Sequence, residues 1–249
     1  MGHVIFIGAG PGTADLITVR GARLLGTANV VLYDALADPT LREYAPAADW
    51  VDVGKRGFSG LPGRDSNGQA RINELLVQYG RTSGTVVRLK GGDPSIFGRL
   101  DEELAAVKAA GITCEVVPGV TAALAAAASS QKPLTRRGSG RSVSLATAMT
   151  RTGDLHATRT ADTEIYYMAG RQLASLSQRL AEAGWPAGTP VAVVSRAGWP
   201  DQLSSEHTVA TLGEAQALHE GRPTAVVVGV GATNVSPSSL GGEEAGPAT

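Results

Sequence analysis

The chain has little cysteine and few aromatic residues, and both shortages limit what it can be. Its single cysteine, Cys114, excludes a disulfide within the chain. Cys114 lies in the apolar run ITCEVV, and we expect it to be a small core residue on a strand. Aromatic residues make up 4% of the 249 residues, so the cores must be built from Val, Leu, Ile and Ala. A chain of this length can bury such cores without disulfides or a metal.

Net charge and long apolar runs are also scarce. A formal net charge of -1 argues against a protein that coats nucleic acid or is held on a membrane surface by charge. The apolar runs stay short of the roughly 18 residues that cross a bilayer. The start, MGHVIFIGAG, lacks a basic stretch and leads directly into a strand, so we expect no signal peptide and a cytoplasmic location.

Two kinds of catalytic motif are missing as well. The four histidines are scattered without the spacing of metal ligands, and there is no cysteine cluster, so we predict no metal site. The Gly-x-Ser-x-Gly motif that places a serine nucleophile on a sharp turn is also absent.

In the first half of the chain, short apolar runs alternate with helical patterns. This alternation predicts a parallel α/β sheet. The segment FSGLPGRDSNG, from Phe58 to Gly68, is rich in Gly, Pro and Ser, and predicts a loop. The expected strands are HVIFIG, VVLYD, WVDVG, TVVRL and ITCEVV, and helices are expected around residues 17–28, 72–79 and 101–111.

The second half has fewer helices between its strands, which favours a mixed sheet. A helix is expected at TAALAAAA and another through Leu173, Leu176 and Leu180, with strands at SVSLAT, EIYYM, PVAVVS, EHTVAT and TAVVVG. Pro118-Gly119 breaks the pattern between the halves. We therefore predict an α/β protein of two α/β domains, residues 1–118 and 119–240, followed by a flexible tail at 241–249.

Three glycine-containing turns follow predicted strands. The first, Gly8 to Gly12, is not the dinucleotide fingerprint, because its third glycine comes two residues after the second rather than three. The second, KGGDP, offers backbone groups and the acceptor Asp93; the third is PGVTA, where Thr121 is a candidate N-cap. Each could be a plain turn. Because ligands bind at the carboxyl ends of strands in open α/β sheets, we expect the three turns to form one pocket.

At this point a resemblance becomes specific. The segments VIFIGAGPGTADLIT, VLYD, VGKRG, VVRLKGGDPSIFGR, VVPGVTA, KPLTRR and YYM occur in this order. Together they resemble the uroporphyrinogen-III C-methyltransferases of the tetrapyrrole methyltransferase family, over residues 3 to about 230. RLKGGDPSIFGR is the most discriminating stretch, since related corrin-pathway enzymes keep the GPG and GDP elements but differ around them.

The resemblance implies two α/β domains with the active site between them, and a homodimer. It implies S-adenosylmethionine as methyl donor and cosubstrate, without a metal. The reaction of that family methylates C2 and then C7 of uroporphyrinogen III, giving precorrin-2, which leads to sirohaem and cobalamin. Substrate carboxylates would then suit the arginines of the basic loops, among them Arg136 and Arg137.

The resemblance also assigns site residues one by one. The proton acceptor falls on Asp34 and the proton donor on Lys55, although Asp34 could instead cap the next turn and Lys55 could be a solvated loop residue. The contacts to S-adenosylmethionine fall on Pro11, Gly91, Gly92, Asp93, Ile96, Thr121, Ala122, Met168, Ala197 and Thr224. From the residues alone, Met168 would be a core residue at a strand end.

The sequence departs from the family in three places: a longer segment between Lys55 and Asn73, LTRR in place of LTHR, and LATAM. These changes put substrate handling in doubt. Three alternatives stay open: methylation of a later corrin intermediate, a nucleotide-binding oxidoreductase, and an S-adenosylmethionine-binding module without catalysis. RLKGGDPSIFGR argues against the first, and the glycine spacing argues against the second.

Overall fold

The computed structural model describes residues 2–54, 64–149 and 155–235, and the chain forms two compact units. The first unit contains residues 1–126 together with the later segments 195–203 and 221–223. The second contains residues 127–194, 204–220 and 224–249. The first unit thus continues beyond Pro118 and takes in two short pieces from the second half of the chain, whereas the sequence pattern placed a single boundary after Pro118.

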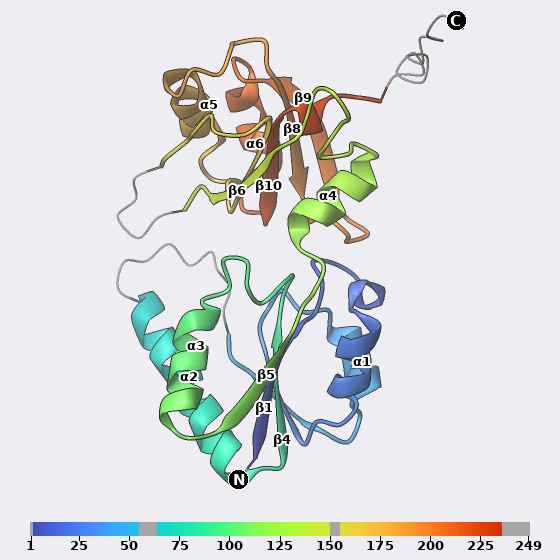
Figure 1. Cartoon of the computed structure of the whole chain (residues 1–249), viewed down its shortest axis with the longest axis vertical. Helices are drawn as coiled ribbons and strands as arrows, with labels where there is room; N and C mark the ends of the chain where they lie inside the picture. The colour runs from blue at the N-terminus through green and yellow to red at the C-terminus, as the bar shows by residue number, and fades with distance from the viewer. Residues whose placement is uncertain (1, 55–63, 150–154, 236–249) are drawn as a thin grey trace, which may run out of the picture. The chain divides into compact units, whose positions relative to one another are not determined.

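The first unit is built on a five-stranded sheet with the order β3-β2-β4-β1-β5. Its strands are β1 (His3–Gly8), β2 (Val30–Tyr33), β3 (Asp49–Asp52), β4 (Thr85–Lys90) and β5 (Thr113–Val117). Every neighbouring pair is parallel, which confirms the predicted parallel sheet. Helix α1 (Val19–Leu25) covers one face, and α2 (Arg64–Thr82) and α3 (Leu100–Ala109) cover the other (Figure 1).

Each face of this sheet has its own core. Ile5, Ile7 and Val87 pack toward Leu25 of α1, and Val4, Phe6 and Val86 pack toward Ile72 and Leu76 of α2. Successive side chains of a strand point to opposite faces, so a sheet covered on both sides needs uninterrupted apolar strands. This is why apolar residues follow one another from Val4 to Ile7 in β1 and occur at Val86, Val87 and Leu89 of β4.

The second unit holds a five-stranded sheet with the order β6-β7-β10-β8-β9. The strands are β6 (Val143–Thr147), β7 (Thr163–Tyr167), β8 (Pro190–Ser195), β9 (Leu203–Thr208) and β10 (Thr224–Gly229). The pair β6–β7 is parallel and the pair β7–β10 is antiparallel, so this sheet is mixed, as predicted. The remaining helices are α4 (Ala122–Ser130), α5 (Leu173–Glu182) and α6 (Gln216–His219), with short 3-10 turns at Ala14–Leu16, Pro39–Tyr44, Leu212–Ala215 and Val230–Ala232.

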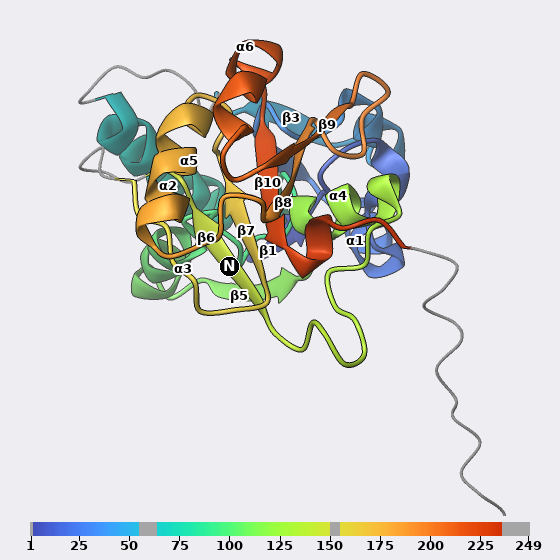
Figure 2. The same cartoon turned by 90° about the horizontal axis from the view of Figure 1, so that it is seen from above.

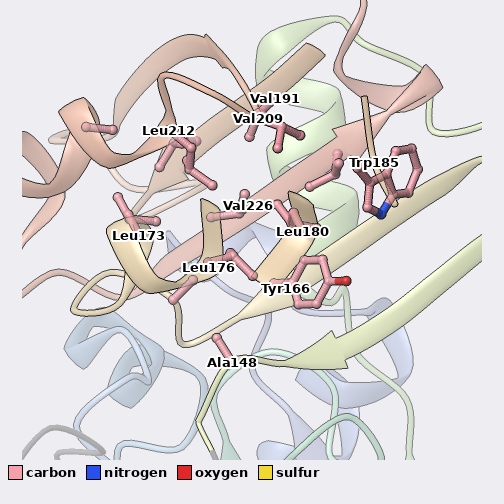
Figure 3. Close-up of a cluster of buried hydrophobic side chains, with 14 of the residues drawn as sticks. Ala148, Tyr166, Leu173, Leu176, Leu180, Trp185, Val191, Val209, Leu212 and Val226 are labelled. Carbon is pink, nitrogen blue, oxygen red and sulfur yellow. The ribbon is translucent and has the colours of Figure 1, made fainter. Parts of the chain in front are cut away.

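Helix α5 supplies the centre of the second core. Its leucines Leu173, Leu176 and Leu180 recur every three or four residues, and all three are fully buried. They pack against Tyr166 of β7 and Val226 of β10 (Figure 3). Figure 2 shows α5 beside the strands of this sheet. The helical periodicity of the sequence therefore identified the buried face of α5.

Three local expectations were wrong. Helix α2 begins at Arg64, so the last five residues of the predicted loop Phe58 to Gly68 are helical. Strand β9 runs from Leu203 to Thr208, because the chain turns after Thr208 through a hydrogen bond from the Thr211 amide to the Thr208 carbonyl. Cys114 is half-buried rather than buried, since β5 is an edge strand. Within the described part of the chain, no helix is both long enough and apolar enough to cross a membrane.

Candidate functional site

The first two glycine turns are joined by their backbones. Gly10 and Gly92 form an isolated antiparallel bridge, in which the Gly92 amide donates to the Gly10 carbonyl at 2.7 Å and the Gly10 amide donates to the Gly92 carbonyl at 3.2 Å. Both residues have a left-handed backbone, with φ of +80° and +71°, which glycine adopts without strain. The turns after β1 and β4 therefore form one rigid piece of backbone.

The third turn is tied to the second by Asp93. One carboxylate oxygen accepts from the Ser95 amide at 2.7 Å, and the other accepts from the Gly119 amide at 2.8 Å. A Cβ on Gly119 would lie 2.3 Å from the Gly92 carbonyl oxygen, so only glycine permits this approach. The expected meeting of the three turns at the carboxyl edge of the sheet is thus present in the first unit.

Gly92 leaves open space beside this platform. A Cβ built on Gly92 would have the Val120 carbonyl oxygen as its nearest neighbour, at 3.9 Å. By contrast, a Cβ on Gly91 would lie 2.5 Å from the Cβ of Leu36, and one on Gly8 would lie 2.6 Å from Gly119. The open side of the platform is therefore at Gly92, where a ligand can approach the backbone closely.

The third glycine of the first turn is explained by the segment 195–203 rather than by a ligand. A Cβ on Gly12 would lie 2.2 Å from the Gly198 carbonyl oxygen. The same oxygen accepts from the Thr13 amide at 3.1 Å. Ala197, one of the predicted contacts, is buried directly before Gly198. This packing places Ala197 in the first unit, beside the turn that carries Pro11.

Asp34 follows β2, and both of its carboxylate oxygens have protein partners. One accepts from the Leu36 amide at 3.2 Å, and the other lies 3.4 Å from Nη2 of Arg88. Asp34 therefore does cap the turn, as the alternative interpretation expected. Asp34 is also paired with the guanidinium of Arg88, which the sequence did not predict. Its side chain is 12% exposed, so a small part of the carboxylate stays accessible.

Three further charged side chains are buried below Asp34. Arg88 and Glu103 are fully buried, and Lys90 is 3% exposed. Glu103 joins the two cations: Oε1 lies 3.3 Å from Nε of Arg88, and Oε2 lies 2.7 Å from Nζ of Lys90. Burial acts to raise the pKa of Glu103, but the charges of Arg88 and Lys90 outweigh it and hold that pKa below its usual value. Burial lowers the pKa of Lys90, and the neighbouring charge of Arg88 lowers it further.

Two predicted contacts, Met168 and Thr224, lie together in the second unit. Met168 directly follows β7, and Thr224 is the first residue of the antiparallel strand β10. Beside them the Ala169 amide donates to the Thr224 carbonyl at 3.4 Å. Met168 has a left-handed backbone with φ of +58°, which is uncommon for a side chain of this size. Two other such residues, Phe97 and Arg196, directly adjoin the predicted contacts Ile96 and Ala197. Strained residues of this kind concentrate at functional sites.

The remaining predicted residues are placed as follows. Pro11 is half-buried between Gly10 and Gly12, and the Ile96 amide donates to the Asp93 carbonyl at 3.2 Å. The Thr121 carbonyl accepts the first bonds of α4, from the amides of Leu124 and Ala125, and Ala122 is the first residue of that helix. Lys55 lies outside the described residues. In the ranges that the structure describes, no group of three or more His, Cys, Asp or Glu side chains could hold a metal ion.

Two nitrogens of Arg136, which the sequence suggested for binding a substrate carboxylate, already have protein partners. Its Nη1 donates to the Asn234 carbonyl at 3.2 Å, and its Nη2 donates to the Thr233 carbonyl. Arg137, the next residue, is exposed. A hollow of about 720 Å³ along the outer face of α2, lined by residues such as Val77 and Ala106, contains none of the predicted site residues.

Sequence reasoning missed the buried charges and the partner of Gly12. A signal for the charges was present, because Arg88 and Lys90 are two residues apart and so share the face of β4 that packs on α2 and α3. Two cations on a buried face require an anion opposite. The partner of Gly12 left no comparable signal, since Gly198 is far away in the chain.

Known proteins are similar to this chain. The model of the family "Tetrapyrrole (Corrin/Porphyrin) Methylases" matches residues 3–216. A siroheme synthase of Psychrobacter cryohalolentis is 40% identical over 226 residues, covering 88% of this chain and 42% of the relative. The chain therefore spans less than half the length of that relative.

Solved structures of known enzymes are also similar to this chain. The uroporphyrin-III C-methyltransferase of Thermus thermophilus, complexed with S-adenosyl homocysteine, has a TM-score of 0.79 and 32% identity, covering 92% of this chain and 98% of that one. A cobalt precorrin-4 methyltransferase has a TM-score of 0.78 and 29% identity, covering 93% of this chain and 96% of that one. The family match includes the three strand-end turns, and it excludes the oxidoreductase alternative. The chain belongs to the tetrapyrrole (corrin/porphyrin) methylase family.

Proposed function

We propose that this protein transfers methyl groups from S-adenosylmethionine to C2 and then C7 of uroporphyrinogen III, giving precorrin-2. The observation that carries the proposal is the platform of three joined turns, which is open at Gly92. It lies at the carboxyl edge of a parallel sheet, where ligands of such sheets bind. The stretch RLKGGDPSIFGR, which includes the second turn of this platform, is the part of the sequence that favours uroporphyrinogen III over a later corrin intermediate.

S-adenosylmethionine suits the residues present. The open space at Gly92 lets a ligand reach the backbone, and Asp93 keeps acceptor capacity for hydroxyl or ammonium groups, since a carboxylate accepts more than two hydrogen bonds. We propose that Pro11, Gly91, Gly92, Asp93, Ile96, Thr121, Ala122 and Ala197 hold it. Met168 and Thr224 stay contacts that the family resemblance predicts. When bound, it supplies a sulfonium methyl group to a carbon nucleophile.

The protein must then handle protons. A pyrrole carbon that gains a methyl group leaves the macrocycle with a proton to shed, so a nearby carboxylate can serve as general base. We propose Asp34 for this role and Lys55 as the proton donor. The Arg88 contact at 3.4 Å supports the assignment of Asp34, because it keeps the carboxylate in one orientation at the end of β2.

The quaternary structure and cellular setting are also proposals. We propose a cytoplasmic homodimer whose product feeds sirohaem or cobalamin synthesis. Apolar side chains on an edge strand support self-association: Val143 and Leu145 of β6 are each 38% exposed, and they point to the same face. The siroheme synthases among the relatives support a place in sirohaem synthesis.

Anaerobic incubation with uroporphyrinogen III and S-adenosylmethionine labelled in its methyl group tests the proposal. We expect two labelled methyl groups per macrocycle, with a monomethylated product appearing first. Transfer to precorrin-2 but not to uroporphyrinogen III would favour a later step of corrin synthesis. Binding of S-adenosylmethionine without transfer to either tetrapyrrole would favour a binding module.

A further inference from the structure

The buried charges beneath Asp34 form a connected chain that runs from α3 to the site. Glu103 of α3 contacts Arg88 of β4 at 3.3 Å, and Arg88 contacts Asp34 at the end of β2 at 3.4 Å. The Arg88 side chain is otherwise fixed by two backbone carbonyls, Leu89 at 2.8 Å and Leu32 at 3.4 Å from Nη1. Each nitrogen of the guanidinium thus has a partner, and its Nη2 is directed at Asp34.

Glu103 is held as firmly as Arg88. Its Oε2 accepts from Nζ of Lys90 at 2.7 Å, and its Oε1 accepts from Nε2 of Gln69 at 3.3 Å. Gln69 in turn donates to Oδ1 of Asn73 at 2.9 Å. The carboxylate of Glu103 therefore has little freedom to rotate away from Arg88.

Stability alone does not explain this arrangement. The same side of the sheet is otherwise packed with apolar residues such as Val4, Phe6 and Leu32. Buried ion pairs seldom stabilise a fold more than apolar residues of similar volume would, because the charges lose their hydration. The ion pairs lie at the carboxyl ends of β4 and β2, where the turn of the GGDP motif and Asp34 begin.

We propose that Glu103 is a positioning residue, which orients Arg88 so that the guanidinium holds the carboxylate of Asp34 in its working position. This inference rests on the proposed function, in which Asp34 is the general base. Lys90 and Gln69 keep Glu103 in place, and Lys90 also balances its charge. Glu103 never touches substrate, and its whole effect on turnover passes through Arg88 and Asp34.

A double-mutant cycle between Glu103 and Asp34 tests this. Glu103→Gln should lower kcat on the order of 10- to 100-fold, as expected for a misplaced catalytic group. Its affinity for S-adenosylmethionine, measured by calorimetry, should stay within about two-fold of the wild type. In the Asp34→Asn background, the same change should lower kcat by less than about two-fold, because residues that act as one unit are not additive.

Glu102→Gln is the matched control. Glu102 precedes Glu103 in the first turn of α3, but its partner is Arg99 at 2.6 Å, and both side chains are partly exposed. The control should keep wild-type kcat. Equal losses of kcat from Glu103→Gln in the wild-type and Asp34→Asn backgrounds would overturn the inference while leaving Asp34 as the base. Wild-type turnover by Asp34→Asn would overturn both the base assignment and the inference.

A second variant covers the possibility that Glu103→Gln does not fold. Removing one anion leaves two buried cations with Asp34 alone, so Glu103→Gln is combined with Lys90→Met, which restores the balance of charge. This pair should fold and should show the same loss of kcat, again masked by Asp34→Asn. A folded pair with wild-type kcat would show that Arg88 needs no carboxylate at position 103, which contradicts the inference.

Discussion

The carbonyl oxygen of Gly198 accepts hydrogen bonds from both the amide and the hydroxyl of Thr13, at 3.1 and 3.4 Å. Gly12, which precedes Thr13, lies against the same carbonyl without room for a side chain. The first glycine turn is therefore closed on one side by a segment from the second half of the chain. Its glycines serve two purposes, a bridge to Gly92 and a contact with Gly198.

Gly12→Ala should destabilise the fold. A Cβ at this position would lie 2.2 Å from a backbone oxygen, so the segment around Gly198 must move. We expect a loss of about 1–3 kcal/mol in the free energy of unfolding, as for other overpacked sites, measured with urea. Gly188→Ala is the control, because a Cβ there would meet nothing within 4 Å. Equal stability of the two variants would contradict the close packing of Gly12.

Gly92→Leu should remove binding of S-adenosylmethionine from a folded protein. The side chain would enter the open space beside the platform, and calorimetry should show at least a ten-fold loss of affinity. Gly138→Leu is the control, because φ is +83° at Gly138 and +71° at Gly92. A Cβ at Gly138 would meet no atom within 4 Å, and one at Gly92 would meet the Val120 carbonyl oxygen at 3.9 Å, so neither position is crowded. The control should bind normally. Unchanged affinity in Gly92→Leu would remove this pocket from the proposal.

The stability lost in Glu103→Gln should depend on pH. The pKa of Glu103 lies below its usual value of 4.5, so its ionised form stabilises the fold above about that pH. This contribution disappears as the pH falls through the lower pKa of the folded state. Near neutral pH the variant should be less stable by about 3–5 kcal/mol, the cost of breaking a buried ion pair. The difference, measured by urea unfolding at several pH values, should shrink in acid, and a difference independent of pH would contradict the ion pairing.

Arg136→Ala should affect stability rather than substrate choice. Its guanidinium is bound to the carbonyls of Thr233 and Asn234, so we expect a loss of about 1.5 kcal/mol, the lower value for hydrogen bonds from a charged group. The preference for uroporphyrinogen III over coproporphyrinogen III, which has fewer carboxylates, should stay unchanged. Arg137→Ala should narrow that preference, because Arg137 is exposed. Both expectations are tested by the ratio of kcat/KM for uroporphyrinogen III to kcat/KM for coproporphyrinogen III, measured in each variant.

Much of the fold was predictable because its strands and helices follow simple periodicities. Runs such as HVIFIG predicted buried parallel strands, and the leucines of α5 predicted its buried face. The beginning of α2 at Arg64 was missed, since Ser66, Asn67 and Gly68 are residues typical of loops. There, contacts made by the rest of the helix outweighed the local preference of the chain.

The site was predictable where local chemistry defined it. The joining of the three turns followed from glycines at the ends of parallel strands. The ion pair between Arg88 and Asp34 was not predictable, because the sequence does not indicate which residue neutralises a charged side chain in an apolar strand. The predicted role of Asp93 was also incomplete, since its carboxylate accepts hydrogen bonds from the amides of Ser95 and Gly119 in addition to any ligand.

Because residues 195–203 belong to the first unit, the chain cannot be divided into two complete fragments by one cut. A fragment ending at Ala126 would carry all five strands of the first sheet, but it would lack the carbonyl of Gly198 that closes the glycine turn on Thr13. The complementary fragment would contain residues 195–203 without the turn they pack against. The two halves of the chain therefore cannot be exchanged independently between relatives. A functional hybrid of two relatives needs to take the glycine turn and residues 195–203 from the same parent.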